Sequence, residues 1–372
     1  MGDNRRIAWI DAWKGLLILL VVLGHVVGAM YHYADGTSRM ALGVVYRAIY
    51  LFHMPAFFFV AGYLWRRHED RSFAICFRDR ARRLVVPYLF WGVVSALVFV
   101  AMIELGGLWI HGNDGYYGAR MFDIPLWRPF VSILHAGDWP NGEGFRYNSV
   151  LWFLPCMFTV LLTYDGLDCV LKKIYKSNSE AIFNITLIAA CTILAALMRF
   201  NKLNYWPWGL SRVPFFLIFF STGRLLRDAP IHGRIAVKRW MLMCGWFFLF
   251  VVAWYYPDLW YGYTTWRWYA YSVAAALYGS LLTLWTAKAV ADMWYGKRLS
   301  VFGFSSIGIM LLHKFLLMPL QMMYQRLSVG SLALLVIEAL AITELVAVIA
   351  EQFSRIIQRI VPWAFGEREK SE

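Results

Sequence analysis

Residues 7–30 read IAWIDAWKGLLILLVVLGHVVGAM, an apolar run long enough to cross a lipid bilayer as one helix. Two ionisable side chains interrupt it, Lys14 near its start and His25 near its end. Eleven residues at about 100° each return a helix to within about 20° of its starting direction, with a rise of about 16 Å. We therefore expect Lys14 and His25 on one face of the helix, with Asp11 one turn before Lys14 and paired with its ammonium.

This polar stripe, defined by Asp11, Lys14 and His25, is the leading candidate for a functional site. Ionisable side chains are expensive inside a membrane, so a stripe of them on one helix face favours a buried reaction path. The alternative is structural: Lys14 would extend to the inner headgroups and His25 to the outer interface.

The composition excludes an ordinary soluble globule. Hydrophobic residues make up 60% of the 372 residues and aromatic residues 18%, whereas soluble domains are about 45 to 50% apolar. We predict an all-α, polytopic membrane helix bundle that forms a single domain over residues 1–372. Ten apolar runs are long enough to span the bilayer, at 7–28, 42–64, 84–105, 150–171, 181–199, 211–226, 239–256, 267–289, 300–320 and 330–353.

The distribution of positive charge predicts the orientation. With the N-terminus inside, about two thirds of the 36 Lys and Arg residues fall on the inner loops and the two ends of the chain. Because cytoplasmic loops retain positive charge, both termini are expected in the cytoplasm and the first helix is expected to stay uncleaved. The net charge of +13 then reflects Lys and Arg residues that line the inner leaflet of the membrane, and it needs no nucleic acid as a partner.

Several other classes of site lack support in the sequence. The five cysteines form no CxxC pair, so we expect neither a disulfide framework nor a metal site. The motifs typical of serine hydrolases, P-loop enzymes and zinc proteases are absent from the sequence. The long outer loop at 106–149 suits either sugar stacking or an interfacial aromatic belt, through Trp109, Trp127, Trp139, Tyr116 and Tyr117.

Two further histidines fall at membrane depth and extend the candidate site. His53 lies in the second expected span and His313 in the ninth, so three imidazoles with His25 could meet in the interior of one bundle. Each alone is more often a packing residue. Pro55 frees a backbone carbonyl one turn before it, which predicts either a kink in the second span or a carbonyl oxygen that faces a cavity.

The first cytoplasmic loop is the most basic part of the chain. Residues 66–83 hold seven Arg residues, with Arg80 and Arg83 expected one turn apart beside the membrane. Planar, bidentate guanidinium groups at this spacing can clamp a pyrophosphate, although the same charges are also what positive-inside topology requires.

The ordered motifs resemble the acyltransferase-3 family of integral membrane acyltransferases, often O-acetylases of surface polysaccharides, over nearly the whole chain. The family's Arg or Lys, ten residues and a His are similar to Lys14 to His25. FHMPAFFFVAGYL resembles a second motif, with Ala61 where Ser is usual, and RDRARRLVVPY resembles a third. Trp152 opens a WFL signature, and His313 resembles a late family histidine.

The resemblance implies transfer of an acyl group, most often acetyl, from cytoplasmic acyl-CoA to a hydroxyl of a surface glycan or a lipid-linked sugar precursor. It makes His25 the catalytic residue and general base, and Lys14, here paired with Asp11, its cationic partner. Arg80 and Arg83, with Lys14, would bind acetyl-CoA, the acyl donor. We assign His53, Trp152 and His313 to substrate binding, and we expect a multi-pass protein of the inner (plasma) membrane.

Two questions stay open at the level of sequence. The acceptor hydroxyl either attacks the thioester directly or reacts with an acyl-enzyme, and direct attack is favoured because no Ser or Cys lies at an obvious helical spacing from His25. The alternative function is a transporter or flippase for a polysaccharide precursor, in which His and Lys would relay protons. The chain shows no paired half-helices or repeat symmetry of the kind many transporters have.

Overall fold

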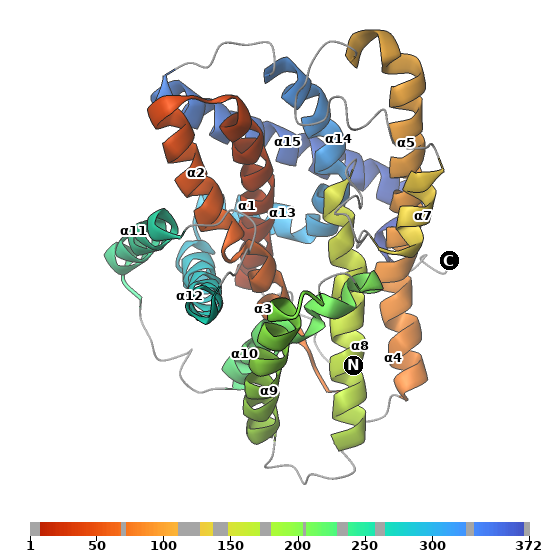
Figure 1. The fold of residues 1–372 in the computed structure, drawn as a ribbon, viewed down its shortest axis with the longest axis vertical. Coiled ribbons are helices and arrows are strands. Elements are labelled where there is room, and N and C mark those ends of the chain that lie inside the picture. The colour runs from red at the N-terminus through yellow and green to blue at the C-terminus, as the bar shows by residue number, and fades with distance from the viewer. Residues whose placement is uncertain are drawn as a thin grey trace. The chain divides into compact units, whose positions relative to one another are not determined.

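Every regular element of the described residues is a helix, as the composition predicts (Figure 1). The outer-loop residues Tyr116, Tyr117 and Trp139 lie outside the described ranges, as does the side chain of Trp109. The computed structural model describes residues 8–67, 72–110, 127–136, 148–171, 180–203, 206–228, 237–256, 265–324 and 331–367.

Among the described residues, seven helices are long and apolar enough to cross a membrane, and one bent helix pair makes an eighth. Each of the ten expected ranges coincides with one helix or with two helices joined at a break. Two of these ranges are short helices, α10 (Val213–Asp228) and α11 (Arg239–Tyr255). The count of ten spans and the cytoplasmic placement of both termini therefore stay predictions.

The chain folds into two compact units. Unit 1 comprises residues 1–65, 184–188 and 218–356, and unit 2 comprises residues 66–183, 189–217 and 357–372. Besides most of α10 and all of α11, unit 1 holds α1 (Ala8–Tyr33), α2 (Gly36–Tyr50), α3 (His53–Leu64), α12 (Trp266–Val290), α13 (Trp294–Phe304), α14 (Ser306–Tyr324) and most of α15 (Leu332–Ile360).

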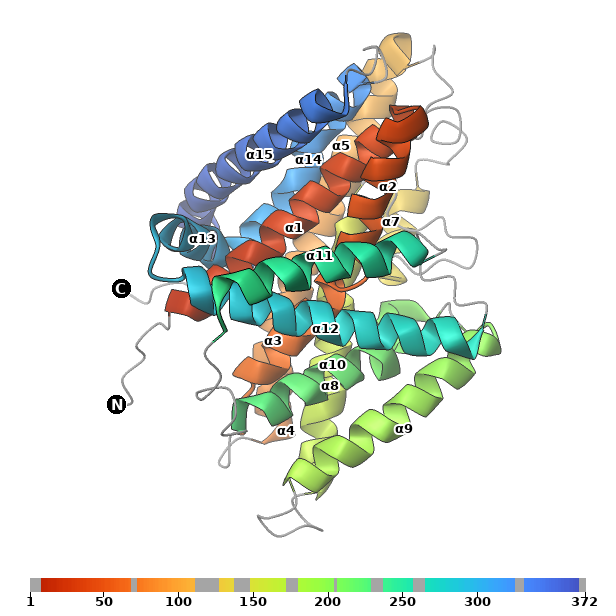
Figure 2. The same cartoon turned by 90° about the vertical axis from the view of Figure 1, so that its left-hand side faces the viewer.

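Unit 1 is organised around α1, which contacts α2, α12, α13 and α14 (Figure 2). Trp13 of α1 is fully buried and donates a hydrogen bond from Nε1 to Thr283 Oγ1 of α12, 3.0 Å away. Its ring packs edge-on against Phe59 and Tyr63 of α3. These contacts fix the rotation of α1 and so the direction in which its polar stripe faces.

Two glycines allow the backbones of α13 and α1 to touch where the two helices cross. A Cβ atom at Gly303 would lie 1.8 Å from the carbonyl oxygen of Asp11, and one at Gly15 would lie 1.8 Å from that of Leu299. Only glycine fits at either position, as is common where membrane helices approach closely. The crossing lies on the turn of α1 that carries Asp11 and Lys14.

Two of the expected spans are broken. The second breaks at Leu51 and Phe52, between α2 and α3, one turn before Pro55, where the sequence predicts a kink. The ninth bends by 83° between α13 and α14. No proline lies near this second bend, so the sequence carries no comparable signal for it.

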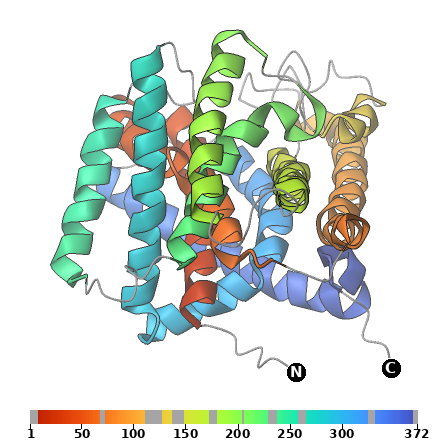
Figure 3. The same cartoon turned by 90° about the horizontal axis from the view of Figure 1, so that it is seen from below.

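In unit 2, α4 (Phe73–Arg80), η1 (Ala81–Val85) and α5 (Val86–Ile110) follow one another as one long composite helix. This helix runs beside α8 (Phe153–Leu171), and Figure 3 shows both nearly end-on. The composite helix carries a π-helical turn, η1, and the C-terminal turn η6 packs on it: Trp91 donates a hydrogen bond to the Ala364 carbonyl, 2.9 Å away. Most of α9 also belongs to this unit. Its elements are α4 (Phe73–Arg80), η1 (Ala81–Val85), α5 (Val86–Ile110), α7 (Arg128–Leu134), η2 (Ser149–Trp152), α8 (Phe153–Leu171), α9 (Glu180–Phe200), η4 (Pro207–Arg212) and η6 (Pro362–Phe365).

Candidate functional site

Three imidazoles meet in the interior of unit 1, as the sequence suggests they could. His25 comes from α1, His53 from the first residue of α3, and His313 from α14. The ring centroids of His25 and His313 lie 5.3 Å apart. Tyr50 joins His53 to the others, since its ring centroid lies 4.7 Å from that of His53 and 6.2 Å from that of His25. We call His25, His53 and His313 the imidazole cluster.

Backbone carbonyls fix the tautomers of two of these histidines. His53 Nδ1 lies 2.8 Å from the carbonyl oxygen of Ile49, and His313 Nδ1 lies 2.9 Å from that of Ile309. A carbonyl only accepts hydrogen bonds, so each Nδ1 carries a proton. In the neutral ring Nε2 then keeps its lone pair. For His313 this buried Nε2 has no hydrogen-bond partner among the described residues, which leaves it able to accept a proton or a hydrogen bond from a substrate.

His25 is held differently, by a tyrosine hydroxyl. Tyr50 Oη lies 3.3 Å from His25 Nδ1, and Tyr50 is the last residue of α2 before the break. Its ring is also stacked on Tyr46, with centroids 4.0 Å apart, so the hydroxyl is carried on a fixed ring. In sites that use a histidine base, a further group commonly orients the second ring nitrogen in this way.

A lysine that sequence reasoning did not single out lies beside the imidazole cluster. Lys314 follows His313 on α14 and is only 7% exposed. Together with His313 and His53, it acts electrostatically on His25. An ammonium buried at membrane depth is a strong pointer to function. The available signal was the ionisable residue inside the apolar run LLHKFLL.

Lys14 and Asp11 form an ion pair, as their spacing predicts. Lys14 Nζ lies 2.6 Å from Asp11 Oδ1, and the two side chains are 28% and 12% exposed. Lys14 and His25 both lie on the unbroken helix α1, eleven residues apart, which corresponds to a rise of about 16 Å. Lys14 is thus too far from His25 for direct contact, whereas Lys314 is next in sequence to His313, whose ring centroid lies 5.3 Å from that of His25.

The arginines expected to bind the donor belong to unit 2. Arg80 ends α4, and its Nε lies 3.4 Å from Asp165 Oδ2 of α8. Arg83 lies in η1 and is exposed. Because η1 is a π turn, the two arginines do not have the ordinary α-helical spacing that the sequence suggests. Such insertions are frequent at functional sites, and Arg83 is the more accessible of the two.

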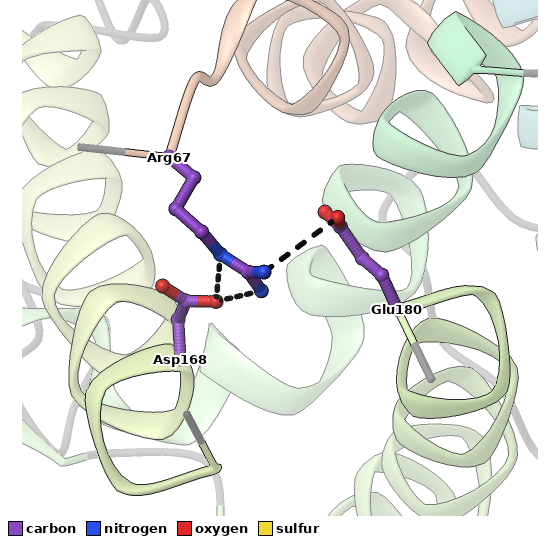
Figure 4. A network of polar contacts seen from close by, with 3 residues as sticks. All are labelled: Arg67, Asp168 and Glu180. Atoms are coloured by element: carbon purple, nitrogen blue, oxygen red, sulfur yellow. Dashed lines mark hydrogen bonds and ion pairs between the residues drawn. The ribbon is translucent and has the colours of Figure 1, made fainter. Parts of the chain in front are cut away.

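A second arginine–carboxylate contact lies on the same helix α8 (Figure 4). Arg67 contacts Asp168 Oδ1 through Nε at 3.0 Å and Nη2 at 2.5 Å, while its Nη1 lies 3.9 Å from Glu180 Oε2. Burial lowers the pKa of Arg67, but its hydrogen bond to Asp168 and the charges of Asp168 and Glu180 outweigh this and raise the pKa above its ordinary value. Arg67 is therefore a permanent cation that neutralises a buried carboxylate.

Trp152 also lies in unit 2, at the end of η2. Its ring stacks on Phe216 with centroids 5.9 Å apart, and the guanidinium of Arg212 lies 4.6 Å from its centroid. These contacts hold the indole in place within unit 2. The structure thus brings His25, His53 and His313 together in unit 1, and it places Arg80, Arg83 and Trp152 in unit 2.

The described residues contain no group of three His, Cys, Asp or Glu side chains placed to hold a metal ion. Tyr50, which lies beside His25, has no signal in the sequence, because an aromatic residue in an apolar run is ordinary and the packing of α2 against α1 brings it to His25.

Residues 7–350 match the family described as an acyltransferase domain, acyltransferase-3. The chain belongs to this acyltransferase family. The resemblance inferred from the motifs is thereby confirmed, and with it an enzyme class that transfers acyl groups. The acyltransferase match covers the polar stripe, the imidazole cluster and Lys314.

Two nodulation proteins named NolL are similar to parts of this acyltransferase. The one from Sinorhizobium fredii is 42% identical over 109 residues, which is 29% of both chains. The one from Mesorhizobium japonicum is 33% identical over 139 residues, which is 36% of both chains. The chain thus aligns with about a third of the length of each of these relatives. No solved structure matches the chain.

Proposed function

We propose that this acyltransferase moves an acetyl group from cytoplasmic acetyl-CoA to a hydroxyl of a cell-surface glycan or a lipid-linked sugar precursor, with His25 as general base. The observation that carries the proposal is the imidazole cluster, in which Tyr50 holds Nδ1 of His25. Family membership gives the class of reaction, and this geometry supports His25 as the base.

The chemistry requires one proton acceptor near the reacting carbon. The acceptor hydroxyl oxygen attacks the thioester carbonyl carbon and passes its proton to His25. The tetrahedral intermediate then collapses, the carbon–sulfur bond breaks, and the leaving thiolate takes the proton from the imidazolium. Acetyl-CoA and an alcohol become an O-acetyl ester and CoA, with no net change in His25.

The rest of the proposed path follows the charge distribution. The basic residues of 66–83 are expected on the cytoplasmic side of the inner membrane, where Arg83, Arg80 and Lys14 would bind the nucleotide end of the donor. The pantetheine arm would extend along α1 to His25, with the acceptor held by His53, His313 and Trp152. Membrane lipid surrounds the apolar helices.

Purified protein in lipid nanodiscs, incubated with labelled acetyl-CoA and a glycan acceptor, tests this proposal. We expect CoA release and label in the glycan, and we expect His25→Gln to abolish both. His135→Gln, a histidine in unit 2 outside the imidazole cluster, is the matched control and should keep wild-type activity. A wild-type protein that moves the glycan across a membrane without consuming acetyl-CoA would instead be a transporter.

A further inference from the structure

Helix α14 carries two ionisable side chains at membrane depth, His313 and Lys314. A general-base role for His25 alone gives Lys314 no function. Lys314 is 7% exposed and His313 is fully buried, and the two are consecutive on a helix that contacts α1. Successive residues differ by about 100° around a helix and about 1.5 Å along it. A lysine side chain at this position stays within the interior of unit 1 and does not extend to a surface.

The position of Lys314 relative to the imidazole cluster gives it a chemical task. The ring of His313 lies 5.3 Å from that of His25, and its buried Nε2 has no hydrogen-bond partner among the described residues. The same region therefore combines an oriented base, an open hydrogen-bond acceptor and a cation. A cation held in a desolvated site stabilises developing negative charge far more than it would in water.

We propose that Lys314 is a catalytic residue of the acyl transfer, whose ammonium donates a hydrogen bond to the carbonyl oxygen of the donor as that oxygen becomes negative in the tetrahedral intermediate. The proposal rests on the function proposed above and names the group that stabilises the oxyanion. As the acceptor oxygen bonds to the carbonyl carbon, the π electron pair moves onto the carbonyl oxygen beside Lys314. It returns when the carbon–sulfur bond breaks, so Lys314 neither gains nor loses a proton.

Lys314 and Lys14 have different tasks in this account. Lys14 is neutralised by Asp11 at 2.6 Å and lies about 16 Å along α1 from His25, so it cannot reach the carbonyl oxygen that His25 serves. A neutral residue at 314 should therefore lower kcat, whereas donor binding should persist.

Steady-state kinetics of Lys314→Met and Lys314→Gln test the proposal, with Lys297→Met on the exposed face of α13 as the matched control. We expect kcat to fall about 100-fold to 1000-fold in both variants at position 314, in the range seen when one oxyanion donor is removed. The Kd for CoA should stay within about threefold of wild type, because the ammonium acts only on the reacting oxygen. Lys314→Arg should recover part of kcat.

Acceptor-free hydrolysis of acetyl-CoA separates the possible roles of Lys314, because it passes through a similar oxyanion without the glycan. If transfer falls while hydrolysis stays at the wild-type rate, Lys314 binds the acceptor and the proposal is wrong. A folded Lys314→Met or Lys314→Gln variant with kcat within about threefold of wild type would also overturn it. Failure of the proposed function would look different, since wild-type protein would then consume no acetyl-CoA.

Discussion

Tyr50 Oη lies 3.3 Å from Nδ1 of His25, and Tyr50 is the last residue of α2 before the second span breaks. The break ends α2 at Tyr50 and begins α3 at His53, and both helices contact α1. In the proposed mechanism, His25 Nδ1 donates a hydrogen bond to Tyr50 Oη, which leaves Nε2 as the base for the acceptor hydroxyl.

Tyr50→Phe should lower kcat about fivefold, since the net value of one hydrogen bond is about 1 kcal/mol and about 1.4 kcal/mol corresponds to a factor of ten. The aromatic ring remains, so stacking on Tyr46 should persist. Tyr271→Phe is the control, because it removes a hydroxyl that donates to the Val252 carbonyl, 2.6 Å away, and not one that contacts His25. Equal kcat in Tyr50→Phe and wild type would show that His25 needs no such orientation.

Lys14→Met should raise KM for acetyl-CoA more than it lowers kcat. The ion pair of Lys14 and Asp11 lies near the N-terminal end of α1, far from His25. Lys14 would therefore contact a part of acetyl-CoA distant from the thioester. The measurement is the initial rate as a function of acetyl-CoA concentration. A variant that loses kcat at saturating donor with KM unchanged would place Lys14 at the reacting atoms and contradict the helix geometry.

Arg83→Ala should weaken CoA binding about tenfold, and Arg80→Ala by less. Arg83 is exposed on η1, whereas Arg80 lies 3.4 Å from Asp165 and is partly neutralised. A charge-assisted contact to phosphate is worth more than a neutral hydrogen bond, and its loss should also weaken the salt dependence of binding. Arg359→Ala, exposed near the end of α15, is the control. If calorimetry gives equal CoA affinity for Arg83→Ala and wild type, the basic loop serves topology alone.

Arg67→Ala should lower stability by about 2 kcal/mol, because Asp168 would remain buried without its cation. This value is below the range for fully buried pairs, since Arg67 is itself 30% exposed. Thermal unfolding in nanodiscs, compared with Arg66→Ala at the neighbouring exposed position, measures the difference. Identical unfolding temperatures for the two variants would show that Asp168 tolerates the loss.

The sequence predicts the helical class and the position of each long apolar helix, because membrane helices need about 20 apolar residues and little else. It also predicts the kink before Pro55 and the meeting of three histidines. It does not predict the 83° bend between α13 and α14, which no proline marks. That bend depends on how α13 crosses α1 at Gly15 and Gly303.

Contacts distant in sequence account for the rest of the candidate site. Arg80 and Asp165 are 85 residues apart, and no periodic pattern connects them. Tyr50 reaches His25 because α2 packs against α1, and the two residues are 25 positions apart in the sequence. The sequence shows Lys314 as an ionisable residue in an apolar run, but its neighbours depend on the packing of α14 against α1, which the run does not predict.

The most direct measurement is a structure of the protein bound to an acetyl-CoA analogue in which a methylene group replaces the thioester sulfur. The account predicts that the carbonyl carbon of the analogue lies beside His25, with its oxygen within hydrogen-bonding distance of Lys314 Nζ. An analogue whose acetyl group lies away from α1 and α14 would contradict the assignment of the imidazole cluster as the site of acyl transfer.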